Sequence, residues 1–365
     1  MTKHGDNSLA QQGWYSYGQQ GREALWTETY WSGQTRENAA ITSLQWNKRL
    51  WGFLTHAWFW WLVAGTVLST ISGVGIWHAK TAKELEAEGR QAVFGFIFGW
   101  YSWALLCGML ATMVGFYLLL DRHWSLGKAQ RWRGTLLWGI LAGVFASAAA
   151  LTLEGYAEPV WHIPYWIDLA FAGPIEETLK LMVPLLLWLV GPKYLREPLN
   201  GVLLVFTSAA VFGIQEGVTY VWDAAGSELA VVMGAARPVS ELLHPSLTLI
   251  AASLIWLVAA RTGRLFSWLG VLGWVIAMAL HSLHDTIGAN VHSSATTAGD
   301  SAANIGMSDP AVFWGTIIVL PLYALLWLIV AFQVMRVFGR ELTPPDAIAH
   351  NPPRWRPLLR PWGVK

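Results

Sequence analysis

Residues 173–180 read GPIEETLK and lie within an apolar run of residues 166–190. Glu176, Glu177 and Lys180 place three ionisable groups within five positions of this run. A charged side chain in the middle of a membrane span costs several kcal/mol unless it is paired, hydrated or protonated. The stretch therefore predicts a membrane helix whose charged groups find partners on other spans.

The composition of the chain is typical of a multi-pass membrane protein. Of its 365 residues, 54% are hydrophobic and 13% are charged, which is about half the charged fraction of a typical soluble domain. Its 25 tryptophans suit two long membrane interfaces, where indole rings are favoured. The net charge of +1 gives no case for a nucleic-acid partner, and the single cysteine, Cys107, excludes an internal disulfide.

Eight apolar segments are each long enough to cross a hydrocarbon core of about 30 Å. The predicted spans are Leu50–Trp77, Val93–Leu120, Thr135–Leu153, Trp166–Val190, Leu199–Trp222, Pro238–Ala260, Ser267–Asn290 and Ala311–Phe338. The fold class expected for residues 50–338 is therefore an all-α polytopic membrane protein with about eight transmembrane helices.

The two ends of the chain are polar. We expect residues 1–49 to form a mobile N-terminal tail and residues 339–365 to form a basic, proline-rich tail. Lysine and arginine are concentrated in these tails and in every second loop. The intervening loops contain only Lys80, Lys83, Arg90 and Arg237. Because basic loops stay on the cytoplasmic side, both termini are predicted to be cytoplasmic.

Three later spans also contain ionisable groups. Glu216 lies in the fifth span, His244 in the sixth, and His281 and Asp285 share one helix face in the seventh. With alternating helix directions and a rise of about 1.5 Å per residue, Glu176, Glu216, His244 and His281 lie roughly 9–15 Å from the outer ends of their spans. The sequence therefore predicts one polar site in the outer half of the membrane.

Each of these polar groups also has a structural explanation. Lys180 could neutralise Glu176, Arg237 could pair with Glu241 near the outer interface, and a lone membrane histidine often serves packing. The Glu176–Lys180 pair leaves the carboxyl group of Glu177 without a cation of its own. Such a group tends to hold a proton or to bind a cation. Because charge is costly within membranes, its convergence from four spans favours a functional site.

Carboxylates and histidines in a hydrated membrane pocket indicate activation of water. A general base, Glu176 or Glu177, would take a proton from water and later give it to a leaving amine. The spacing favours Glu177, since Glu176 is better placed for neutralisation by Lys180. Lys180, a protonated histidine or a metal ion could stabilise the oxyanion. No serine or cysteine is placed with a histidine as a nucleophile pair at the same depth, because Ser282, next to His281 in the sequence, points to another face of the helix; this favours hydrolysis by water over a covalent acyl-enzyme.

The ordered motifs resemble those of the PrsW family of intramembrane proteases, which is related to the CAAX prenyl endopeptidases. The motifs are Glu176-Glu177-x-x-Lys180, Phe212-x-x-x-Glu216, Arg237 followed by His244, and His281-x-x-x-Asp285. The resemblance places the catalytic helices within residues 166–290 and implies as catalytic residues Glu176, Glu177, Lys180, Glu216, His244, His281 and Asp285. It implies an enzyme of the prokaryotic plasma membrane that cuts membrane-anchored proteins, such as an anti-sigma factor, near the extracytoplasmic side.

The resemblance leaves the use of a metal open. PrsW members are classed as metalloproteases, whereas the prenyl endopeptidases can be understood as metal-free glutamate enzymes. Glu216, His244 and His281 would form a two-histidine, one-carboxylate set with an open position, as in catalytic zinc sites. Zinc is therefore the cofactor that these residues would take, if they take one.

The surroundings of Glu216 contain a departure from the family pattern. The family often has asparagine after this glutamate, whereas this chain has Gly217. Together with Gly213, this glycine brackets the acid and predicts the close approach of another helix.

Two other classes of function are alternatives. Intramembrane Glu, Lys and His also form relays in proton- or cation-coupled transporters, which need polar groups across the whole membrane depth. A non-catalytic membrane protein could hold single-span partners in the same groove. The clustering of the polar groups in the outer half favours the protease.

Overall fold

The computed structural model describes residues 13–16, 22–26, 31–37, 56–79, 99–124, 126–161 and 165–296, and the single positions 318, 322, 325, 326 and 329. The predicted eighth span, Ala311–Phe338, lies outside the described residues except at those five positions, and the C-terminal tail lies outside them altogether.

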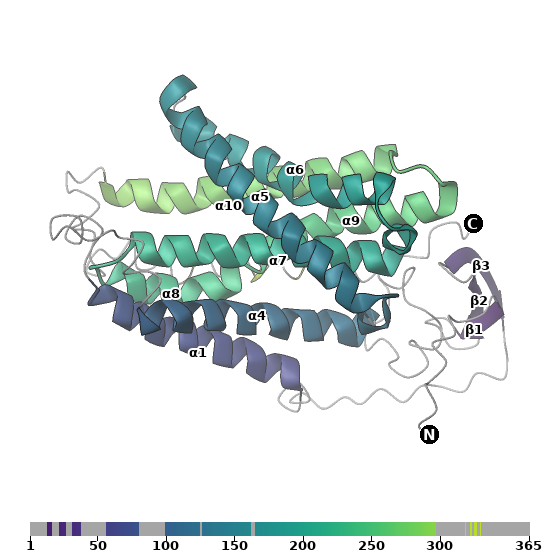
Figure 1. Ribbon diagram of the computed structural model, residues 1–365, viewed down its shortest axis with the longest axis horizontal. Helices are drawn as coiled ribbons and strands as arrows, with labels where there is room; N and C mark the ends of the chain where they lie inside the picture. Colours follow the sequence, from purple (N-terminus) through teal and green to yellow (C-terminus); the bar gives the residue numbers. More distant parts are fainter. Residues whose placement is uncertain are drawn as a thin grey trace.

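Long helices make up most of the described chain (Figure 1). They are α1 (Ala57–Trp77), α4 (Trp100–Trp124), α5 (Trp132–Trp161), α6 (Tyr165–Val190), α7 (Pro198–Asp223), α8 (Leu229–Ser240), α9 (Leu243–Thr262) and α10 (Trp268–Thr296), with short 3-10 turns η2 (Leu126–Lys128) and η3 (Lys193–Arg196). The first five predicted spans and the seventh each overlap one of these helices, and the sixth overlaps the end of α8 and most of α9.

Five described stretches are long and apolar enough to cross a membrane. They are Ala57–Trp77, Trp100–Arg122, Trp132–Glu154, Pro198–Asp223 and Leu229–Thr262. The 26-residue helix α6 is not among them, because Glu176, Glu177 and Lys180 interrupt its apolar sequence. The described residues thus support a multi-pass membrane protein. The count of eight spans and the cytoplasmic placement of both termini stay predictions.

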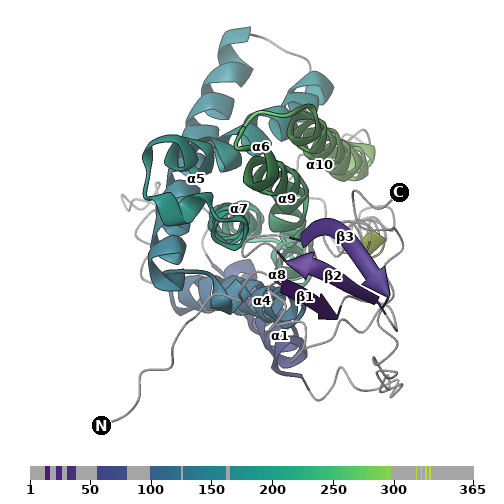
Figure 2. The same ribbon diagram turned by 90° about the vertical axis from the view of Figure 1, so that its right-hand side faces the viewer.

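The N-terminal segment contains a small sheet that the sequence did not predict. Strands β1 (Gly13–Ser16), β2 (Arg22–Trp26) and β3 (Trp31–Glu37) pair antiparallel in the order β1-β2-β3 (Figure 2). Aromatic residues and threonine, which favour strands, occur in these segments between short polar stretches. The helical prediction therefore holds for the described part of residues 50–338, and the expectation of a mobile tail is corrected for the strands at residues 13–16, 22–26 and 31–37.

Helix α7 lies at the centre of the helical bundle. It contacts α4, α5, α6, α8 and α9, and Figure 2 shows it end-on with the other helices around it. Helix α10 packs against α6 and α9, and α1 packs against α4 and α8 (Figure 1). The helices that carry the predicted polar groups, α6, α7, α9 and α10, are therefore neighbours in space.

The predicted sixth span, Pro238–Ala260, is not one uninterrupted helix. Helix α8 ends at Ser240 and α9 begins at Leu243. Pro245 explains the break, because a proline lacks the backbone N–H and its ring clashes with the carbonyl group four residues earlier, that of Glu241. That carbonyl oxygen instead accepts a hydrogen bond from the His244 N–H at 3.3 Å. The break lies at the polar site and positions Glu241 there.

Glycine allows the closest contact between α7 and α9. A Cβ atom on Gly201 would lie 1.9 Å from Nε1 of Trp256, a fully buried side chain whose indole N–H donates to the Leu195 carbonyl at 3.0 Å. The small side chain therefore fixes the distance between the two central helices.

Gly201→Ala should lower the free energy of unfolding by about 1–3 kcal/mol, because the added methyl group overpacks against the indole ring. Thermal unfolding of the purified protein in detergent, followed by circular dichroism, measures this loss. Gly134→Ala is the matched control, since its Cβ atom would approach only the Tyr194 hydroxyl oxygen, at 3.1 Å. Equal stability of the two variants would contradict the packing argument.

Candidate functional site

The charged residues of α6 form a buried ion-pair cluster. Nζ of Lys180 donates to Glu176 Oε2 and to Glu177 Oε1, each at 3.0 Å. The lysine is fully buried, and its ammonium group lies 4.2 Å from the ring centroid of Phe212. The helix spacing of three and four residues brings both carboxylates to one ammonium group. Neutralisation by Lys180 therefore does not distinguish the two glutamates, contrary to the expectation from spacing.

Glu177 is held by donors from three helices. Besides Lys180, the Thr248 hydroxyl donates to its Oε2 at 2.6 Å, and Nδ1 of His281 lies 2.9 Å from its Oε1. The side chain is fully buried. Thr248 was not predicted as a site residue. Its position four residues after His244, on the same face of α9, is the sequence signal that could have indicated it.

His281 is oriented by Glu177 rather than by Asp285. With Nδ1 on the Glu177 carboxylate, Nε2 lies 3.5 Å from Glu176 Oε2 and 3.6 Å from Asp285 Oδ2. Both of these distances exceed a normal hydrogen bond. Glu177 therefore orients the imidazole through Nδ1, which leaves Nε2 facing the carboxylates of Glu176 and Asp285.

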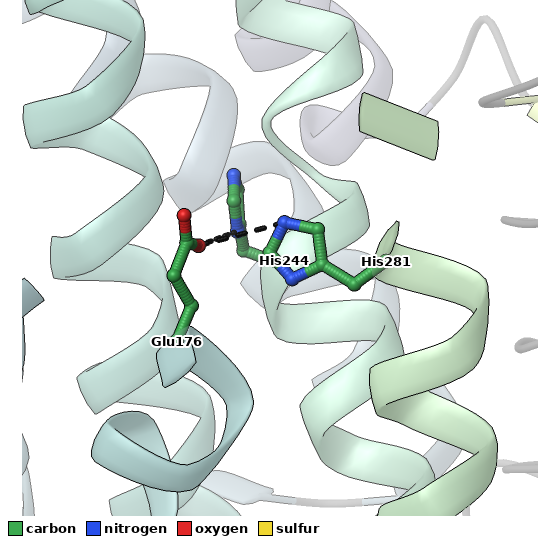
Figure 3. Close-up of side chains that lie close together, drawn as sticks. All are labelled: Glu176, His244 and His281. Carbon is green, nitrogen blue, oxygen red and sulfur yellow. Dashed lines mark ion pairs between the residues drawn. The ribbon is translucent and has the colours of Figure 1, made fainter. Parts of the chain in front are cut away.

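His244 joins the α6 cluster to a second group of carboxylates. Its Nδ1 atom lies 2.7 Å from Lys180 Nζ. Its Nε2 atom lies 3.0 Å from Glu216 Oε2 and 2.9 Å from Glu241 Oε2. Figure 3 shows the imidazole beside His281 and Glu176, with the ring centroids of the two histidines 4.9 Å apart and nearly perpendicular.

Arg237 is the cation of this second group. Its guanidinium donates to Glu241 Oε1 at 2.8 Å and lies 3.8 Å from Glu216 Oε1. It also stacks on the Tyr220 ring, 3.5 Å from the centroid. The sequence predicted the pair of Arg237 and Glu241, but as a structural pair at the interface. The structure places Glu241 against His244, with Arg237 on the other oxygen of the same carboxylate.

The site contains two groups of side chains that could hold a metal ion. One is Glu176, His244 and His281, and the other is Glu216, Glu241 and His244; in each, the ligand atoms lie within 4.8 Å of one another. The predicted set of Glu216, His244 and His281 shares two members with each group. All the predicted site residues are thus brought together, with Glu241, Arg237 and Thr248 added.

A family comparison gives this site its context. The model of PrsW family intramembrane metalloproteases matches residues 130–326, more than half of the chain. The chain belongs to the PrsW family. The match includes all the helices of the site, and it identifies the protein as an intramembrane protease. No curated protein and no solved structure matched the chain in the other two comparisons.

Lys180→Met should destabilise the folded protein by about 3–5 kcal/mol, because it leaves buried carboxylates without their cation. Thermal unfolding in detergent measures the effect. Adding Glu176→Gln and Glu177→Gln to the same chain removes the unpaired charges and should recover much of the lost stability. A Lys180→Met protein as stable as the wild type would show that the cluster is not held by this ion pair.

Proposed function

We propose that the protein hydrolyses a peptide bond of membrane-anchored proteins with a water molecule activated by Glu176 and His281. The observation that carries this proposal is the buried arrangement of Glu176 Oε2 and His281 Nε2, 3.5 Å apart. A water molecule that contacts both atoms would have one acceptor for each of its hydrogens. Geometry of this kind suits general-base catalysis.

Glu176 is the better candidate for the base. Both oxygens of Glu177 already accept from donors, and its side chain is fully buried. Glu176 has Lys180 as its close donor, and its side chain keeps 8% of its surface exposed. We assign to Glu176 the proton transfer from water to the leaving amine. Glu177 holds His281 with its Nδ1–H engaged, so that Nε2 accepts from the water.

Lys180 and the site histidines can stabilise negative charge. The ammonium group of Lys180 is fully buried and has three donor hydrogens, so its field acts at short range on an oxyanion beside Glu176. A tetrahedral oxyanion in this position would lie near Lys180 and His244, which are 2.7 Å apart.

The donor set fits the metal that the family name implies. The described site contains the carboxylates of Glu176, Glu177, Glu216, Glu241 and Asp285, against the permanent cations Lys180 and Arg237. This excess of negative charge favours a bound cation, and oxygen and imidazole nitrogen are suitable ligands for zinc. Each of the two candidate groups, both of which contain His244, offers three such ligands. When bound, the ion would polarise the scissile carbonyl group and acidify water.

The substrate class follows from the position of the site within membrane helices. We propose that the substrate is a single-span membrane protein cut near the extracytoplasmic side, of the anti-sigma-factor type, in a prokaryotic plasma membrane. The estimated depth of the polar groups in the outer half of their spans and the family membership support this assignment.

Glu176→Gln should lower kcat for cleavage of a membrane-anchored substrate by about 10²–10⁴-fold, because the general base is lost. Glu177→Gln should act mainly by releasing His281 and cost less. The assay uses purified protein in detergent with a tagged single-span substrate. Cys107→Ser is the control with full activity, since this exposed cysteine lies outside the site.

Cleavage by the Glu176→Gln and His244→Ala proteins at the wild-type rate would contradict the catalytic proposal. Intact substrate that co-purifies with the wild-type protein, without cleavage, would identify a binding protein instead. Ion flux in proteoliposomes that depends on Glu216 would identify a transporter.

Chelation should abolish cleavage, and added zinc or cobalt should restore it. The reason is that the ion supplies the carbonyl polarisation that the protein cations alone cannot replace. The measurement is the initial cleavage rate after treatment with a chelator, followed by titration with each metal. An unchanged rate in metal-free protein, verified by elemental analysis, would support a metal-free glutamate mechanism.

A further inference from the structure

Two carboxylates converge on one nitrogen atom at the break between α8 and α9. Glu216 Oε2 and Glu241 Oε2 lie 3.0 Å and 2.9 Å from His244 Nε2. His244 Nε2 carries at most one proton, so it can donate to only one of these two oxygens, and neither oxygen has a further hydrogen-bond partner among the described residues. The Glu241 side chain is only 1% exposed, so solvent does not satisfy it. A buried carboxylate oxygen without a donor is costly and favours a proton or a cation beside it.

Arg237 orients these two oxygens. Its guanidinium contacts the opposite oxygen of each carboxylate, Oε1 of Glu241 at 2.8 Å and Oε1 of Glu216 at 3.8 Å. The Oε2 atoms are thereby left toward His244. Outer partners that fix the orientation of ligands in this way are typical of metal sites.

Gly217 provides the space that Glu241 occupies. A Cβ atom at this position would lie 2.8 Å from Cγ and 3.3 Å from Cδ of Glu241. A larger residue here would displace the carboxylate. Glycine at position 217 is therefore what allows Glu241 to reach His244.

The other candidate metal-binding group, Glu176, His244 and His281, is already in contact with a cation, the ammonium group of Lys180. Lys180 Nζ lies 3.0 Å from Glu176 Oε2 and 2.7 Å from His244 Nδ1, which are two of the three donors of that group. A divalent ion there would lie against the ammonium group and be repelled by it.

We infer that a divalent metal ion binds to Glu216 Oε2, Glu241 Oε2 and His244 Nε2, with Gly217 and Arg237 shaping the site. The ion takes the place of the Nε2 proton, which leaves to solvent, while Nδ1 keeps its contact with Lys180 Nζ at 2.7 Å. Glu241 takes the place that the sequence had assigned to His281. Two carboxylates and one histidine leave a fourth position open in tetrahedral zinc geometry. His281 is then free to work with Glu176 on water. The inference rests on the proposed function, whose metal it locates.

The test measures metal binding directly in the full-length protein. Metal-free protein in detergent is titrated with Zn²⁺, and the bound ion is examined by X-ray absorption spectroscopy. We expect one zinc ion per chain and a first shell of nitrogen and oxygen that contains one imidazole. Two imidazoles around the zinc would place it at His244 and His281 and overturn the assignment, as would wild-type protein that binds no zinc.

Four variants distinguish the residues that would coordinate the ion from residues that only lie near it. Glu241→Gln should weaken zinc binding by more than about 100-fold, beyond the usual effect of an outer partner. Gly217→Ala changes no ligand but displaces Glu241, and should weaken binding by about 10–100-fold, an effect of the size seen for outer partners. His281→Gln should keep the wild-type affinity for zinc. Glu154→Gln is the matched control, since this carboxylate interacts electrostatically with Glu176 and Glu216 but belongs to neither donor group.

Circular dichroism and size-exclusion chromatography establish that each variant is folded. Wild-type zinc affinity in folded Glu241→Gln, or in folded Gly217→Ala, would overturn the assignment. The proposed function fails separately: zinc bound at this site in a protein that cleaves no membrane-anchored substrate would retain the site and reject the protease mechanism. Cleavage of the substrate by protein that binds no zinc would retain the protease function and reject the zinc site.

Discussion

The ammonium group of Lys180, fully buried among the site helices, is the interaction on which the site depends. It contacts two carboxylates of its own helix and the imidazole of His244 on α9, at 2.7–3.0 Å. Charges of this kind are tolerated within a membrane protein only when they face one another inside the bundle. The positions of α6, α9 and α10 relative to one another are therefore set by electrostatics as much as by packing, and the catalytic geometry follows from the same contacts.

His244 divides the site into two chemically different halves. On its Nδ1 side lie Lys180, the two α6 glutamates and His281, which suit proton transfer and stabilisation of charge. On its Nε2 side lie two carboxylates oriented by Arg237, which suit a cation. One side chain thus lies between the group proposed to activate water and the group proposed to bind a metal ion.

The sequence predicted the membrane class, the helices of the site and the residues that converge, because charge in an apolar run has few explanations other than function. It did not predict the role of Glu241, because an Arg–Glu pair four residues apart is ordinary on a helix surface. Only the break before Pro245 shows that this pair lies at the site. Thr248 was not predicted as a site residue because hydroxyl side chains are common on helices. The order of the two α6 glutamates could not be resolved from spacing, since one ammonium group reaches both. The N-terminal strands were missed because short aromatic segments in a polar context carry a weak signal.

The charge cluster of α6 also has a consequence for how the protein enters the membrane. At about 2.5–3.5 kcal/mol for each charged residue at the centre of a span, the charges of this helix oppose its partition into lipid by itself, and its internal ion pairs offset only part of that cost. Its partners His244 and His281 lie on helices that are synthesised later. We therefore expect α6 to insert stably only together with α9 and α10, as one cooperative unit, after the apolar helices α1, α4 and α5.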